Sequence, residues 1–215
     1  MFVGHYSAAF VAASHPKAPR LGTLFVAAQL IDIAFFSFIP LGIEHMRMVP
    51  GTSATNPMDL YDLPWTHSLI GALGWAVGFG LILRLTTRST TAAVIGGAVV
   101  VSHWLLDLLV HVPDLTIAGA PPKLGLGLWN HPMIEMPLEI GLLFASAWLY
   151  ARSTRVREKG WLLPALIILL LALQAFNWFG PVATKVDAGV WAMGLFAYAL
   201  AAAFASWVAR NRVAR

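Results

Sequence analysis

The sequence predicts an all-α protein, a polytopic transmembrane helical bundle with about six spans and a short N-terminal half-helix. Composition is the first observation behind this prediction. Hydrophobic residues make up 59% of the 215 positions and charged residues only 11%, against about a quarter in soluble domains. Mean hydropathy is +0.73. The apolar residues also gather into runs of about 20, the length that crosses a hydrocarbon core of about 30 Å.

The apolar runs define the elements in order along the chain. Residues 2–14 would make a helix only about 20 Å long at about 1.5 Å per residue, so they predict a half-helix that does not cross the membrane. The longer runs predict the spans, at 21–42, 66–85, 92–112, 133–151, 161–181 and 189–209. No repeat or composition shift divides the chain. We therefore expect a single integral membrane domain over 1–215, with site-bearing helices in 1–151 and two scaffold spans in 152–215.

Basic residues orient the predicted spans. Of the 14 Lys and Arg residues, only Arg47, Lys123 and Lys185 fall on one side of the membrane. The positive-inside rule makes the other side cytoplasmic. We therefore expect a multi-pass protein of the plasma membrane with a cytoplasmic C-terminus and the 43–65 and 113–132 loops facing outward. No basic segment precedes the first apolar run, which argues against a cleaved signal peptide. The net charge of +4 is spread over short loops and the C-terminus, so nucleic acid is not an expected partner.

Histidine and carboxylate side chains interrupt one span at helical spacing. In SHWLLDLLVHVPD, His103, Asp107 and His111 are four residues apart and Asp114 follows. Helical residues i, i+4 and i+8 share one face, so these groups form a stripe. At about 1.5 Å per residue, His103 lies at a similar depth to Asp32 in the first span, roughly 18 Å from the cytoplasmic end.

Other segments place similar groups at the same level. HPMIEMPLE repeats the spacing with His131, Glu135 and Glu139. His67 opens the span at 66–85 on the outer side, and His5 in the half-helix reaches a similar depth. All these groups converge on the outer half of the membrane.

The cluster predicts a cation site. An ionised residue near the bilayer centre costs on the order of 3 kcal/mol, so several together must be paired, hydrated or bound to a cation. The chain has no cysteine, which excludes disulfides and thiolate metal sites. Histidine with carboxylate suits zinc, manganese or non-haem iron. A hydrogen-bonded structural pair of His103 with Asp107 is the alternative.

The outermost polar residues suggest a different role. We expect four of them to line the rim or the substrate access path: His111, Asp114, His131 and Asp62. Asp62 is also a candidate N-cap for the span at 66–85. Glu44, in the long outer loop, is expected to be an ordinary solvated charge.

Four segments carry a family resemblance: GHYSAAF near the start, Asp32 in QLIDI, WTHS at 65–68 and SHWLLD at 102–107. In this order and spacing, over roughly the first 115 residues, they resemble the membrane-bound metal-dependent hydrolase family of bacterial inner-membrane proteins. The resemblance implies a metal site formed by His5, Asp32, His67, His103 and Asp107. Ala34 stands where the family usually has a second acid, and Asp62-Leu63 where it usually has a His-Arg pair. Glu135 and Glu139 are candidate replacement ligands.

The sequence therefore predicts a membrane-embedded metal-dependent hydrolase that acts on a small-molecule or lipid substrate, most naturally a lipid or lipid-linked ester or phosphoester. One or two zinc ions are the expected cofactor, with manganese or iron as alternatives, and a water of lowered pKa is the nucleophile. Glu139 or Glu135 would act as general base. Other classes could use the same ligands: an intramembrane proton or metal-ion transporter, although no inverted repeat is evident, a non-haem metal oxidoreductase, or a haem protein.

Overall fold

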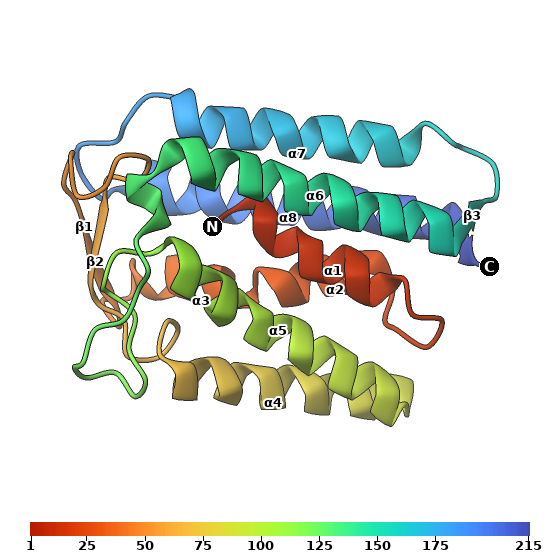
Figure 1. The fold of residues 1–215 in the computed structure, drawn as a ribbon. Coiled ribbons are helices and arrows are strands. Elements are labelled where there is room, and N and C mark those ends of the chain that lie inside the picture. Colours follow the sequence, from red (N-terminus) through yellow and green to blue (C-terminus); the bar gives the residue numbers. More distant parts are fainter.

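The computed structural model describes residues 1–215 as a bundle of helices that run along one long axis (Figure 1). Five helices are long and apolar enough to cross a membrane: α4 (Leu69–Thr87), α5 (Thr90–Val110), α6 (Pro132–Ser153), α7 (Leu162–Phe179) and α8 (Ala188–Arg210). The pair α2 (Leu21–Ala28) and α3 (Leu30–Phe38) makes a sixth if it is counted as one bent span. The predicted all-α polytopic bundle is confirmed.

The N-terminal half-helix lies inside the bundle. It consists of a 3-10 turn, η1 (Val3–His5), followed by α1 (Tyr6–Ala13), and it packs against α2, α5 and α6. Tyr6 and Phe10 are fully buried, and the Tyr6 ring stacks on Phe25 at 4.2 Å between centroids. Apolar side chains on every face allow this short helix to be enclosed by its longer neighbours.

The first predicted span is broken in its middle. α2 and α3 meet at Gln29 with a bend of 50°, where the sequence contains neither proline nor glycine. The Gln29 side chain is fully buried, and its amide Nε2 donates to the carbonyl of Phe2 at 3.1 Å. The bend therefore coincides with the attachment of this span to the N-terminal segment.

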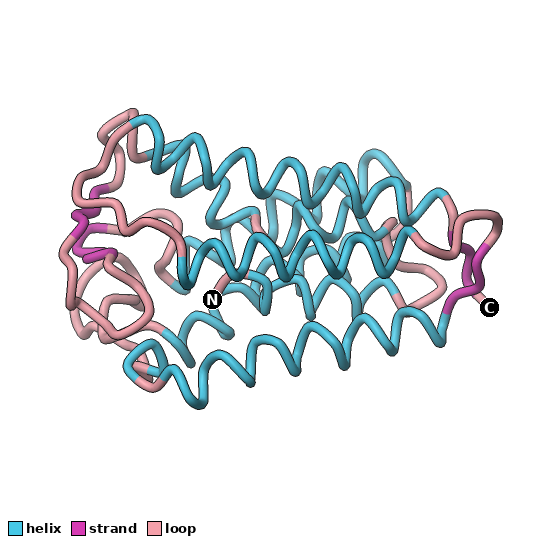
Figure 2. The backbone as a smooth tube through the Cα atoms, turned by 90° about the horizontal axis from the view of Figure 1, so that it is seen from above, coloured by secondary structure: helices cyan, strands magenta, loops and turns pink.

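Each end of the bundle carries a small antiparallel sheet (Figure 2). At one end β1 (His45–Met48) pairs with β2 (Met58–Asp62) beside the loop at 111–131, which includes the short η2 turn (Leu128–Asn130). At the opposite end β3 (Thr154–Val156) pairs with β4 (Arg212–Ala214). The loops before α2, between α4 and α5 and between α6 and α7 lie at this second end, together with the C-terminus (Figure 1).

One predicted helix cap is wrong. The N-cap of α4 is Ser68, whose Oγ accepts from the backbone N–H of Gly71 at 3.0 Å. Asp62 instead lies on the β1–β2 hairpin, where it contacts His45 at 2.9 Å. Asp62 precedes the helix by too many residues because the chain turns through Trp65 and Thr66 before α4 begins.

Candidate metal centre

A cluster of histidine and aspartate side chains lies inside the bundle, supplied by several separate segments. Its members are His5 from η1, Asp32 from α3, His67 from the turn before α4, and His103, Asp107 and His111 from α5 and its C-cap. The four-residue spacing along α5 brings its three members to one face, as the sequence predicts. Five of the six side chains are at most 3% exposed, and Asp32 is 14% exposed.

Two histidine nitrogens lie close to two carboxylate oxygens in the cluster. The Nε2 atoms of His67 and His103 each lie 3.4 Å from Asp32 Oδ1. They lie 3.8 and 3.0 Å from Asp107 Oδ2, respectively. Ligand atoms held about 2.0–2.2 Å from a tetrahedral zinc ion are about 3.3–3.6 Å from one another. The observed separations bracket that range.

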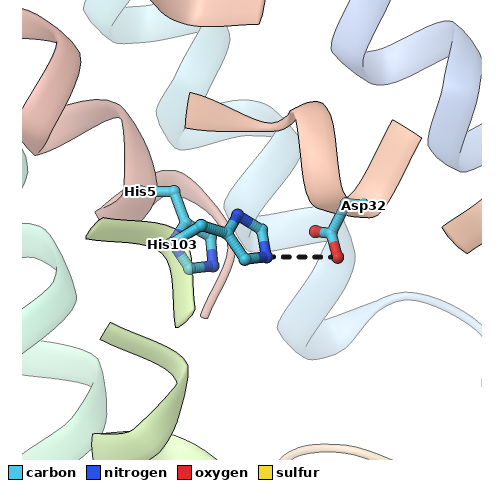
Figure 3. A group of neighbouring side chains, drawn as sticks. All are labelled: His5, Asp32 and His103. Carbon is cyan, nitrogen blue, oxygen red and sulfur yellow. Dashed lines mark ion pairs between the residues drawn. The ribbon is translucent and has the colours of Figure 1, made fainter. Parts of the chain in front are cut away.

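A second group of donors lies on the other side of Asp107. Its Oδ1 is 3.0 Å from His5 Nε2 and 3.5 Å from His111 Nε2, and it also accepts from the α-amino group of Met1 at 2.9 Å. The His5 ring stacks on His103 with 3.7 Å between centroids and 8° between planes (Figure 3). The α-amino group is paired with Oδ1, whereas Asp107 Oδ2 has no hydrogen-bond partner and is the oxygen that remains for a cation.

The ring nitrogen of His103 that points away from the aspartates has its own hydrogen-bond partner. This atom, Nδ1, lies 2.8 Å from the carbonyl oxygen of Ala28. A carbonyl can only accept, so Nδ1 carries a proton, and Nε2 is the ring nitrogen that faces Asp32 and Asp107. Ala28 is the last residue of α2. The bend after it therefore helps to position a histidine on a different helix.

His67 is oriented by a buried chain of hydrogen bonds. The Thr66 hydroxyl donates to Glu44 Oε2 at 2.6 Å and accepts from His67 Nδ1 at 2.8 Å. Glu44 Oε1 also accepts the backbone N–H groups of Trp65 and Thr66, both at 2.8 Å. With Nδ1 held by Thr66, Nε2 of His67 faces the cluster. Partners of this kind are typical of histidines that bind metal ions.

The expectation for Glu44 was wrong, because its side chain is fully buried rather than solvated. The β1–β2 hairpin that follows it folds over this end of the bundle and removes it from water. The position of Glu44 in a polar loop carries no signal of this burial. The role of Thr66 has a sequence signal, because in the motif WTHS it directly precedes the candidate ligand His67.

His111 and Asp114 lie within the cluster rather than at an open rim. They are 3% and 8% exposed, and His111 Nδ1 lies 2.8 Å from Asp114 Oδ1. This contact on Nδ1 turns His111 Nε2 toward Asp107, 3.5 Å from its Oδ1. Trp129 covers the imidazole of His111, with 4.1 Å between ring centroids.

The remaining access candidates lie outside the cluster. His131 is exposed at the start of α6, and Asp62 is 49% exposed and paired with His45 on the hairpin. Neither makes a contact with the cluster's members.

The two candidate bases on α6 have different surroundings. Glu139 Oε1 accepts from the backbone N–H groups of Phe2 and Gly4 at 2.6 and 2.8 Å, and Oε2 accepts from Gln174 at 3.3 Å. Glu135 is equally buried, at 1% exposure, but its Oε2 has no hydrogen-bond partner. Glu139 therefore holds the N-terminal segment in place, whereas Glu135 has a buried carboxylate oxygen without a hydrogen-bond partner.

The predicted scaffold spans also contribute to the site. On α8, the Tyr198 hydroxyl donates to Asp32 Oδ2 at 3.0 Å, which leaves Oδ1 facing the two histidines. On α7, Gln174 contacts Glu139 and accepts from the N–H of Val3 at 3.2 Å. A lone glutamine in an apolar span is a visible sequence signal, whereas a single tyrosine is not.

Unsatisfied polar atoms test whether the cluster fits a metal ion. The buried atoms His5 Nδ1, His5 Nε2, His103 Nε2 and Asp107 Oδ2 have no hydrogen-bond partner, although some lie within 3.0 Å of each other. Each buried polar group left unsatisfied costs about 1–3 kcal/mol. Within two sets, His5–Asp32–His103 and His67–His103–Asp107, all donor atoms lie within 4.8 Å of one another. These residues fit a divalent ion.

Comparisons with protein-family models, curated proteins and solved structures give no match. The fold and the site by themselves define a class: a helical membrane protein with a buried cluster of histidine and aspartate that can hold a metal ion.

Proposed function

We propose that this protein is a membrane-embedded metal-dependent hydrolase of the family that its sequence motifs resemble. One observation carries the proposal: three histidines whose Nδ1 atoms are held by neighbouring oxygens turn their Nε2 atoms toward two aspartates inside an apolar bundle. A structural pair would use those atoms in hydrogen bonds with each other. Here they lie close together without hydrogen-bond geometry, which is the arrangement of ligands around a cation.

Zinc is the proposed ion, because the donor set is nitrogen and carboxylate oxygen at tetrahedral separations. His103 would hold the ion together with His67 and Asp107, or together with His5 and Asp32. A divalent ion at this position supplies Lewis-acid polarisation of a substrate oxygen and makes water a stronger acid. Manganese or iron would provide the same positive charge.

The chain's own groups complete the proposed reaction. Hydrolysis of an ester or phosphoester adds water across the scissile bond, and the attacking water must lose a proton. Glu135 is the proposed acceptor because its Oε2 is buried and unpaired. Glu139 orders the segment that carries His5, and Tyr198 holds Asp32. A positioned general base contributes typically 10²–10⁴-fold to rate.

The surroundings favour a substrate that belongs to the membrane. The cluster is buried between spanning helices. His111, one of its members, caps the end of α5 that lies on the side of the β1–β2 hairpin (Figure 1). Basic residues gather in the loops at the opposite end, and the positive-inside rule makes that end cytoplasmic. We therefore place the site in the outer half of a bacterial plasma membrane. The substrate class is a lipid or lipid-linked ester or phosphoester.

A turnover screen tests the proposal. Protein reconstituted in nanodiscs would be incubated with phospholipids and lipid-linked phosphoesters, and products would be measured by mass spectrometry. We expect turnover that a chelator abolishes and zinc restores. Glu135→Gln should lower the rate by roughly 10²-fold or more with unchanged metal content, and the exposed Glu158→Gln should not.

Other outcomes would reject the hydrolase. Chelated protein that turns over substrate as fast as the zinc-loaded form would remove the metal from the mechanism. Metal or proton flux across liposomes, with no turnover of any substrate in the screen, would assign the cluster to a transporter instead.

A further inference from the structure

An apolar groove runs along the outside of the bundle between α3 and α4. Its volume is about 850 Å³, and its walls include the aromatic rings of Phe38, Trp65, Trp75 and Phe79. Its floor includes Gly71, Gly74 and Gly78 of α4. At Gly71 the carbonyl oxygen of Trp65 lies where a Cβ atom would be, whereas Gly74 and Gly78, four residues apart on one helix face, leave their space open.

Gly74 and Gly78 are not explained by helix packing. A Cβ atom added at Gly80 or Gly97 would lie 3.2 or 3.1 Å from a backbone carbonyl oxygen of the facing helix, so those glycines permit the close approach of α4 and α5. A Cβ added at Gly74 or Gly78 would meet nothing within 4 Å. The two glycines therefore leave space open rather than bring helices together.

The dimensions and surroundings of the groove match a lipid chain. On α4 the groove extends from Ser68 to Ile82, which is about 21 Å at about 1.5 Å per residue. One leaflet contributes about 15 Å of hydrocarbon, so the groove is long enough for a chain that descends from the membrane surface. The α4 side chains beside it, Val77, Leu81 and Leu85, are 58–79% exposed and face lipid. The groove is therefore continuous with the lipid-facing surface of the bundle.

The groove and the metal centre are built from the same two segments. α3 carries Asp32 between the groove residues Leu30 and Phe38, and His67 lies between the groove residues Trp65 and Ser68. We infer that the groove seats one acyl chain of a membrane lipid, so that the lipid's head-group linkage lies at the level of His67. This inference rests on the proposed hydrolase function and specifies the part of the substrate that the protein recognises.

Photocross-linking in nanodiscs tests whether the groove holds an acyl chain, and it does not require turnover. The probe is a phosphatidylcholine with a diazirine in one acyl chain, and peptides are mapped by mass spectrometry. We expect more cross-links on residues 68–82 than on the lipid-facing side of α6. Gly74→Leu with Gly78→Leu should lower them roughly tenfold, the loss expected when about two methylene groups lose their contacts. Gly141→Leu is the matched control, because its Cβ also meets nothing within 4 Å and it is exposed on α6.

The outcomes separate the two proposals. Cross-links spread evenly over α4 and α6, or unchanged in the Gly74→Leu/Gly78→Leu protein, would overturn the groove assignment even if the protein hydrolyses lipids. Cross-links confined to the groove, in a protein that hydrolyses no substrate in the screen, would support acyl-chain binding in the groove and count against the hydrolase proposal. Thermal unfolding and metal content of both glycine variants should match wild type, which shows that the change acts on the groove alone.

Discussion

The hydrogen-bond chain behind His67 gives the most specific prediction. Thr66→Val keeps the shape of the side chain but removes the hydroxyl that joins Glu44 to His67. His67 Nδ1 then has no acceptor, and the imidazole is free to change tautomer or rotate. Loss of such a partner typically weakens metal binding 10- to 100-fold, which corresponds to about 1.4–2.7 kcal/mol. The assay is competition for zinc against a fluorescent chelator in detergent micelles.

Two variants control this experiment. Thr66→Ser restores the hydroxyl and should recover most of the affinity. Thr86→Val removes a hydroxyl that donates only to the backbone carbonyl oxygens of its own helix, and it should leave affinity unchanged. If Thr66→Val binds zinc as tightly as wild type while remaining folded, His67 is not a ligand oriented through Thr66 and the reasoning fails.

Three further predictions follow from neighbouring contacts. Tyr198→Phe removes the hydrogen bond to Asp32 and should weaken zinc binding by about tenfold in the same competition assay; an unchanged affinity would mean that Asp32 is held by other groups. Asp114→Asn replaces the carboxylate that contacts His111 Nδ1 with an amide able to donate to that nitrogen. It should lower the number of zinc ions bound in native mass spectrometry if His111 is a ligand, and wild-type stoichiometry would count against that role. Gly4→Ala adds a Cβ that would collide with neighbouring side chains. Because overpacking costs typically about 1–3 kcal/mol, thermal unfolding should begin at a lower temperature. An unchanged transition would show that the N-terminal segment packs loosely.

The helices could be predicted from the sequence because the membrane imposes a simple rule on them. A span must satisfy its backbone internally and present apolar side chains to lipid, so runs of apolar residues predict the long helices to within a few residues. The break at Gln29 was not predictable by that rule. It coincides with a hydrogen bond between Gln29 and Phe2, which are far apart in sequence.

The members of the cluster were visible in the sequence for the same physical reason. Ionisable groups inside an apolar run are costly and therefore conspicuous, as His103 and Asp107 are on α5. Their supporting partners were not conspicuous. Glu44 lies in a polar loop where carboxylates are ordinary, and Tyr198 is one aromatic residue in an apolar span. Their contacts with Thr66 and Asp32 exist only once the bundle has folded.

The metal content of the purified protein tests the central claim most directly. Protein prepared in detergent without chelators would be analysed by elemental and native mass spectrometry, beside His103→Ala and the exposed control His131→Ala. We predict one or two equivalents of zinc in wild type and in His131→Ala, and loss of bound zinc in His103→Ala, since removal of one ligand leaves the remaining donors incomplete. A wild-type protein that binds no divalent metal even after incubation with zinc, or a His103→Ala protein with the wild-type metal content, would contradict the account.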